Sequence, residues 1–174
     1  MKRLPILAAL ALLATACGSS SSTTTTSPTS TNKLVFSALL SPANEVPPVT
    51  NAESVVTGNA TVTLDVTRDG SGNIASAIAT FNVTLGNFPA GSLVNIAHIH
   101  EGATTCACPV VVNTALAAGE VTVSNGLASF TKVVNSVDAA VAQRISANPA
   151  GFYFNVHSTL NSGGVARGIL VKVQ

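Results

Sequence analysis

The sequence predicts an all-β fold, an antiparallel sandwich or barrel of about eight or nine short strands with one short helix. Hydrophobic residues make up 47% of the 174 positions and charged residues only 9%, a ratio that excludes a disordered chain. Val, Leu, Thr and Ala recur in short alternating runs, as in half-buried strands. No stretch repeats another at a fixed period, which indicates one domain. A net charge of +1 without a basic cluster argues against nucleic acid as a partner.

The first residues, 1–16, are predicted to be a lipoprotein signal peptide. Lys2 and Arg3 precede an apolar run at 4–14, which is shorter than the about 20 residues that a membrane-spanning helix needs. The run LATAC, which ends at Cys17, resembles the lipobox of bacterial lipoproteins, in which the cysteine is acylated and becomes the mature N-terminus. We therefore expect lipidation at Cys17. The alternative is an ordinary cleaved signal peptide with an incidental cysteine.

Residues 17–32 are expected to be a tether, because a segment built almost entirely of Ser and Thr cannot bury apolar surface. The N-terminal acyl chains would attach the domain at 33–174 to a membrane of the bacterial cell envelope, on the extracytoplasmic side. Gly18 and Ser19 follow the cysteine in place of the Asp that is associated with inner-membrane retention. In a cell with two membranes, this favours the outer membrane.

Alternation of apolar and polar residues predicts the strands. It is cleanest at 61–67, where the valines and the leucine should face the core. The segment 41–48 should be irregular, because its prolines cannot donate to a strand ladder. The pair Asn125 and Gly126 is a two-residue hairpin signal. The expected strands lie at 34–39, 61–67, 74–85, 93–100, 110–113, 120–124, 127–131, 152–157 and 166–173.

One short helix is expected after these hairpins. Val137, Val141 and Ile145 recur at four-residue spacing, which places them on one helix face directed at the core. Ser136 is suited to cap the N-terminus, and Pro149 should end the helix.

Five motifs in this order resemble the CHRD domain, a family named for its repeats in chordin, an extracellular antagonist of bone morphogenetic proteins. The resemblance covers about 33–174 and implies a β-rich extracytoplasmic fold. By analogy with chordin, it also implies a binding module. The chain departs from the family at two places. Val165 and Ala166 replace an acidic and a branched residue, and Cys106 and Cys108 lie where many relatives have a loop that contains Gly or Asn. The motifs are NEVPPV at 44–49, AHIHEGA at 97–103, PVV at 109–111, NPAGFYFNVHS at 148–158 and GGVARG at 163–168.

All three histidines lie in these motifs. His98 and His100 are two residues apart on a predicted strand, so both project from one face with Cβ atoms about 7 Å apart. On the later strand, His157 shares a face with Tyr153 and Asn155. If the two faces meet, three imidazoles could bind Zn²⁺ or copper and leave one coordination position open. The alternative is a structural role, in which the histidines hydrogen-bond backbone carbonyls or Asn155 and need no metal.

Two further features could contribute to such a site. Glu101 or the pair Cys106 and Cys108 could add a ligand. In an exported protein the cysteines can equally form a local disulfide, because their thiols meet oxidants. Glu45 and Arg167 are interpreted as structural residues, Glu45 as a hydrogen-bonding loop residue and Arg167 either as an ion-pair partner or as a residue that marks the family fold.

No pattern of a hydrolase is present in the sequence. Ser158 directly follows His157, so their side chains diverge along a strand, and there is no Gly-x-Ser-x-Gly elbow. We therefore expect a protein that is not an enzyme. The function predicted is that of a tethered binding module for a protein or polymer partner of the envelope. The alternative is binding of copper or zinc through His98, His100 and His157.

Overall fold

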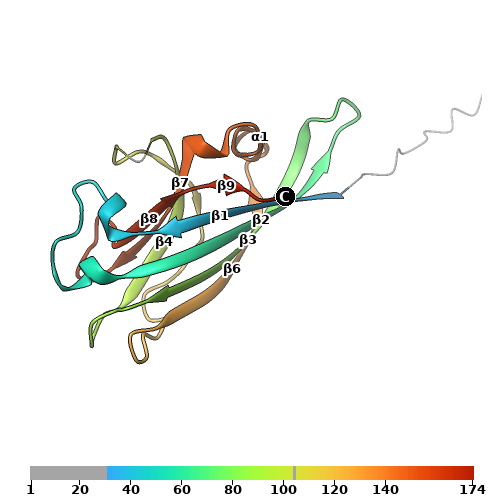
Figure 1. Ribbon diagram of the computed structural model, residues 1–174. Helices are drawn as coiled ribbons and strands as arrows, with labels where there is room; N and C mark the ends of the chain where they lie inside the picture. Colours follow the sequence, from blue (N-terminus) through green and yellow to red (C-terminus); the bar gives the residue numbers. More distant parts are fainter. Residues whose placement is uncertain (1–30, 104) are drawn as a thin grey trace, which may run out of the picture.

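The structure, a computed structural model, describes residues 31–103 and 105–174 and consists of two antiparallel β-sheets packed face to face (Figure 1). The predicted sandwich is therefore confirmed, and the alternative of a closed barrel is not found. The predicted signal peptide, the lipid acceptor Cys17 and nearly all of the tether lie outside the described residues.

The larger sheet has five strands in the order β6-β3-β2-β1-β9. Its long strands β1, β2 and β3 follow one another along the chain as antiparallel neighbours. The predicted alternation at 61–67 is confirmed, because Val62, Leu64 and Val66 are fully buried. The strands are β1 (Thr31–Leu40), β2 (Thr57–Arg68), β3 (Ile74–Gly86), β6 (Ala128–Val137) and β9 (Val171–Lys172).

The smaller sheet has four strands in the order β5-β4-β7-β8. One of its faces packs on the larger sheet, where the ring of Phe154 stacks on Phe81 with centroids 5.7 Å apart. The register places His98 opposite Asn155 and Asn155 opposite Arg167, so these three side chains share the other face. The strands are β4 (Val94–Glu101), β5 (Val110–Asn113), β7 (Phe152–Ser158) and β8 (Ala166–Ile169).

The chain between β1 and β2 is irregular, as its prolines predict. It contains two short 3-10 helices, η1 (Pro42–Asn44) and η2 (Ala52–Val55), and carries two buried acidic residues, Glu45 and Glu53. A third 3-10 helix, η3 (Pro149–Gly151), leads into β7. The η1 segment contacts β8, because Asn44 Nδ2 donates to the carbonyl of Arg167.

The end of the chain crosses between the sheets. The single strand predicted at 166–173 is wrong: β8 pairs with β7 in one sheet, and β9 pairs with β1 in the other. Leu170, fully buried, lies at the crossing. Gly168 allows the close approach of β8 to β1, because a Cβ atom there would overlap the carbonyl oxygen of Leu39.

The strand predicted at 120–124 is also wrong. The segment starts in a turn, in which the Glu120 N–H donates to the Ala117 carbonyl, and it makes only an isolated bridge, between Ser124 and Leu127. The predicted hairpin turn within that bridge is confirmed. Asn125 and Gly126 have φ values of 51° and 76°, the left-handed conformations that a two-residue hairpin of this type requires.

The helix α1 (Ala139–Ala147) begins later than predicted. Asp138 caps it by accepting a hydrogen bond from the Val141 N–H at 2.9 Å, whereas the proposed cap, Ser136, lies in β6. Asp138 is favoured because its side chain reaches the free amides of the first turn. Val141 and Ile145 face the core, as expected. Among the described residues, no helix is long and apolar enough to cross a membrane.

Candidate metal centre

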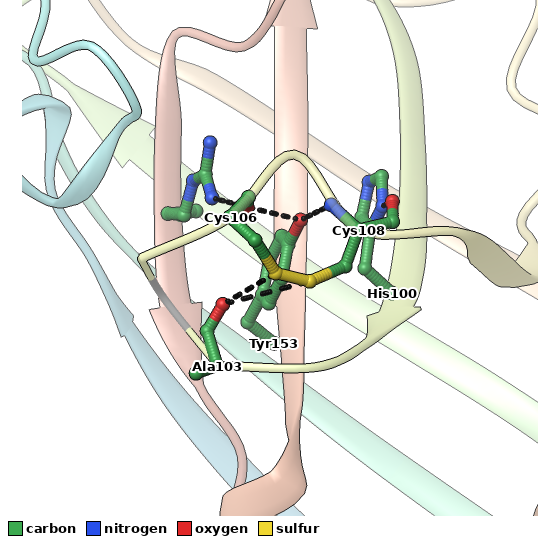
Figure 2. The surroundings of a disulfide bond; sticks show 6 residues. His100, Ala103, Cys106, Cys108 and Tyr153 are labelled. Atoms are coloured by element: carbon green, nitrogen blue, oxygen red, sulfur yellow. Dashed lines mark hydrogen bonds between the residues drawn. A yellow bond between two sulfur atoms is a disulfide. The ribbon is translucent and has the colours of Figure 1, made fainter.

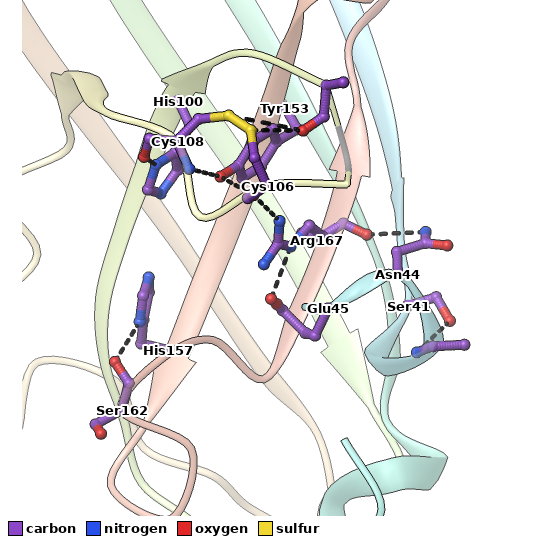
Figure 3. Close-up of polar contacts among 12 residues, drawn as sticks. Ser41, Asn44, Glu45, His100, Cys106, Cys108, Tyr153, His157, Ser162 and Arg167 are labelled. Atoms are coloured by element: carbon purple, nitrogen blue, oxygen red, sulfur yellow. Dashed lines mark hydrogen bonds and ion pairs between the residues drawn. A yellow bond between two sulfur atoms is a disulfide. The ribbon is translucent and has the colours of Figure 1, made fainter. Parts of the chain in front are cut away.

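The outer face of the smaller sheet is polar but buried. Alternation along β4 and β7 directs Ile99 and Phe154 into the core and His98, His100 and Asn155 to the opposite face. That face is covered by three connections of the chain: the loop at 102–109, the loop at 159–164 and the segment between β1 and β2. Figure 3 shows side chains from all three around the same face. Polar groups there are thus removed from water and must find partners within the protein.

The structure brings all three histidines together. The ring of His98 lies between the other two, with centroids 4.6 Å from His100 and 4.5 Å from His157. One ring nitrogen from each histidine lies within 4.8 Å of those of the other two. The three residues are only 7–8% exposed. The spacing in the sequence could not show whether His157 lies near His98 and His100. It does, because β4 and β7 are adjacent strands of one sheet.

Two backbone carbonyls fix the orientation and tautomer of the outer rings. His100 Nδ1 lies 2.6 Å from the carbonyl oxygen of Cys108, and His157 Nδ1 lies 2.8 Å from that of Ser162 (Figure 3). A carbonyl oxygen can only accept, so each Nδ1 carries the proton and each Nε2 holds a lone pair. Both Nε2 atoms, and Nδ1 of His98, are buried and have no hydrogen-bond partner in the described part of the chain.

Burial keeps the cluster neutral. Desolvation, together with the neighbouring His157 and His100, lowers the pKa of His98 to about 3. Burial also lowers the pKa of His100 and of His157, although the hydrogen bonds to Cys108 and Ser162 oppose this. At neutral pH all three imidazoles are therefore in the unprotonated form that binds a metal ion.

The loop at 102–109 is held over His100 by a disulfide and by Tyr153 (Figure 2). Cys106 and Cys108 are bonded to each other, which leaves neither sulfur as a thiolate ligand. The Cys108 N–H donates to the Tyr153 hydroxyl at 3.1 Å, and this hydroxyl donates to the Cys106 carbonyl at 3.2 Å. These contacts position the Cys108 carbonyl that accepts from His100.

Tyr153 and Arg167 extend the cluster across the sheet. The Tyr153 ring stacks on His100 at 4.6 Å with an interplanar angle of 8°, and the Arg167 guanidinium lies 4.6 Å from the centre of the same ring. Arg167 Nε donates to Glu45 at 2.7 Å, and Nη1 donates to the Cys106 carbonyl at 2.8 Å. Arg167 and Glu45 are 2% and 4% exposed, so this is a buried ion pair. Burial raises the pKa of Glu45, and Arg167 opposes that rise.

Glu101 is not part of this cluster. Its carboxylate forms two hydrogen bonds of 2.8 Å with Arg144 of α1, near the molecular surface. The sequence named Glu101 as an additional ligand, but the direction of β4 turns its side chain away from His100.

Sequence reasoning missed Glu53 altogether. This fully buried carboxylate accepts from the Ser158 hydroxyl and, at 2.6 Å, from Asn161 Nδ2. Both contacts fix the loop at 159–164, whose Ser162 carbonyl orients His157. The partners of Glu53 are more than a hundred positions away in the sequence, so local patterns give no signal for this contact.

The architecture and the cluster define a β-sandwich with a polar site buried under loops on one sheet. A family model for the CHRD domain matches residues 36–170, and the chain belongs to this family. The resemblance that the five motifs indicate is therefore confirmed. No curated protein and no solved structure matches the chain.

The histidine cluster should make stability depend on pH. The pKa of His98 is about 3 in the folded protein and about 6.5 in the unfolded chain, so between these values only the unfolded state takes up the proton. The free energy of unfolding should be highest above pH 6.5 and fall on acidification, by up to about 1.4 kcal/mol per pH unit for this residue. Urea unfolding with EDTA from pH 7 to pH 4 measures the slope.

His98→Gln is the control for this measurement, because it removes one titrating group and leaves Glu45 and the other histidines in place. The difference in unfolding free energy between wild type and variant should shrink as the pH falls. Parallel pH profiles would show that His98 is not neutral and buried in the folded protein.

Proposed function

We propose that this domain is a binding module for a copper or zinc ion, held by His98, His100 and His157. One observation supports the proposal above all others: each of the three buried imidazoles brings a ring nitrogen within 4.8 Å of the other two, and one buried nitrogen of each ring has no hydrogen-bond partner among the described residues. Buried polar atoms are nearly always paired, so three unpaired ring nitrogens at one place are costly. A cation bound between them would satisfy all three.

The contacts behind the rings are those expected of metal ligands. Metal-binding histidines usually donate their second ring nitrogen to a carbonyl or carboxylate, which fixes the ring and makes it more basic. His100 and His157 do this through Cys108 and Ser162. Tetrahedral Zn²⁺ requires nitrogens about 3.3 Å apart, given bonds of about 2.0–2.1 Å. The ring nitrogens lie within 4.8 Å of one another, so a bound ion would have to draw them closer together.

A purely structural role explains the cluster less well. Histidines that serve as hydrogen-bonded struts would use both ring nitrogens, whereas here the inward nitrogens have no partner among the residues that the structure describes. The choice between zinc and copper rests on chemistry alone, because imidazole suits both ions. The proposed role is binding of the ion and not catalysis.

We also propose that the module is displayed in the bacterial cell envelope. Acylation of Cys17 would attach it to the membrane, and the Ser/Thr-rich segment at 17–32 would hold it just off the surface. The support for this is the lipobox-like run and the composition of the tether. The same display would present the domain to a protein or polymer partner, which is the role that chordin suggests for the family.

Metal binding should raise thermal stability. An ion that binds only the folded state at about a hundredfold its Kd adds about 2.7 kcal/mol, which corresponds to a rise in Tm of several degrees. The protein, freed of metal with EDTA and dialysed, is melted with and without Zn²⁺ or Cu²⁺.

Gln substitution of each histidine should abolish the rise in Tm. Asn113→Ala, next to His98 on the same face, should preserve it. Equal shifts in wild type and histidine variants would contradict the proposal.

The disulfide loop should strengthen metal binding without supplying a ligand. Replacing Cys106 and Cys108 by Ser frees the loop and loosens the Cys108 carbonyl that orients His100, so Zn²⁺ affinity should fall by about tenfold or more. Competition with a chromophoric chelator measures the change. Thr105→Ala, an exposed substitution in the same loop, is the matched control. An affinity within twofold of wild type in the double variant would show that His100 is oriented without the disulfide.

A further inference from the structure

We propose that the ion at the three-histidine site binds a small oxyanion carrying one hydrogen, of the bicarbonate type, as its fourth ligand, and that Asn155 and Arg167 recognise it. This inference rests on the proposed metal site. Three histidines leave a fourth position of a tetrahedral ion open. The nature of the ligand is inferred from the polar groups that lie beside the cluster on the same sheet face.

Asn155 supplies a hydrogen-bond acceptor. It lies on β7 between His98 and Arg167 in the register of the sheet, and two residues from His157 on the same strand face. The side chain is 1% exposed, and its Oδ1 has no partner among the described residues. A ligand that satisfies Oδ1 must donate a hydrogen.

Arg167 supplies a donor and a positive charge. Nε is used by Glu45 and Nη1 by the Cys106 carbonyl, whereas Nη2 donates to no hydrogen bond in the described chain. Figure 3 shows this free end of the guanidinium on the side of His100 and His157. A ligand beside it should offer an acceptor, and guanidinium favours an oxyanion.

The charge of the site also favours an anion. The Glu45 carboxylate is balanced by Arg167, and imidazoles bind a metal ion in their neutral form, so a bound divalent ion would leave two positive charges buried. Uncompensated buried charge is costly, and an anionic ligand reduces it. The ligand should therefore carry a negative charge, accept a hydrogen bond from Arg167 and donate one to Asn155. Bicarbonate can do all three, since it would coordinate through a negative oxygen and donate its hydroxyl hydrogen to Asn155.

The test compares bicarbonate with nitrate, a planar monoanion of similar size that has no hydrogen to donate. The wild-type protein is loaded with one equivalent of Cu²⁺, and each anion is titrated while the visible and EPR spectra of the ion are recorded. Bicarbonate should perturb the spectra at a concentration at least about tenfold lower than nitrate, the effect of one buried hydrogen bond. Equal potency, or no perturbation by bicarbonate, would overturn the inference.

Variants assign the two residues. Asn155→Leu keeps the volume but removes the acceptor, so the preference for bicarbonate over nitrate should fall to threefold or less. Arg167→Lys keeps the pairing with Glu45 but loses the free guanidinium nitrogen, so both anions should bind more weakly. Asn113→Leu, opposite His98 on β5, is the matched control and should leave the preference unchanged. A preference that survives in Asn155→Leu would overturn the role of Asn155.

Failure of the metal site is distinguishable from failure of the anion site. A wild-type protein that does not bind Cu²⁺ overturns both proposals, whereas one that binds Cu²⁺ but ignores bicarbonate overturns only the second. If circular dichroism shows that a variant does not fold, the comparison of the two anions on the wild-type protein still decides whether the preference exists.

Discussion

The chemistry of this domain depends on two hydrogen bonds, from the Nδ1 atoms of His100 and His157 to the carbonyls of Cys108 and Ser162. Each bond fixes a ring and its tautomer, and so directs a lone pair inward. With His98 between them, the three buried rings bring together ring nitrogens that have no hydrogen-bond partner in the described chain. The burial that makes this arrangement costly also keeps the imidazoles neutral and ready to bind a cation.

The remaining parts of the fold keep those two carbonyls in place. Glu45 holds Arg167, and Arg167 with Tyr153 holds the disulfide loop that carries Cys108. Glu53 holds the loop that carries Ser162, through Ser158 and Asn161. Both acidic residues come from the irregular segment between β1 and β2. One proline-rich connection therefore supports the site from two sides, which gives a physical reason for the family motif around Glu45.

Much of the fold could be predicted from local patterns, because alternation marks strands whose two faces differ. The turn at Asn125 and Gly126 was predictable for a similar local reason. The segment 120–124 has the composition of a strand, but the chain turns at its start and leaves only the bridge between Ser124 and Leu127. Spacing placed His98 and His100 on one face. That β7 would lie beside β4, and that Arg167 would meet Glu45 across the chain, depends on tertiary packing that one sequence does not encode locally.

The central claim is that three inward lone pairs form one metal site, and long-range ¹H–¹⁵N NMR spectra of the imidazoles test it most directly. Without metal, His100 and His157 should appear as neutral Nδ1–H tautomers at pH 7. One equivalent of Zn²⁺ should shift the inward nitrogens of all three rings together, and further metal should change nothing more. The Nε2–H tautomer at either outer histidine, or rings that respond separately or not at all to the first equivalent, would contradict the account.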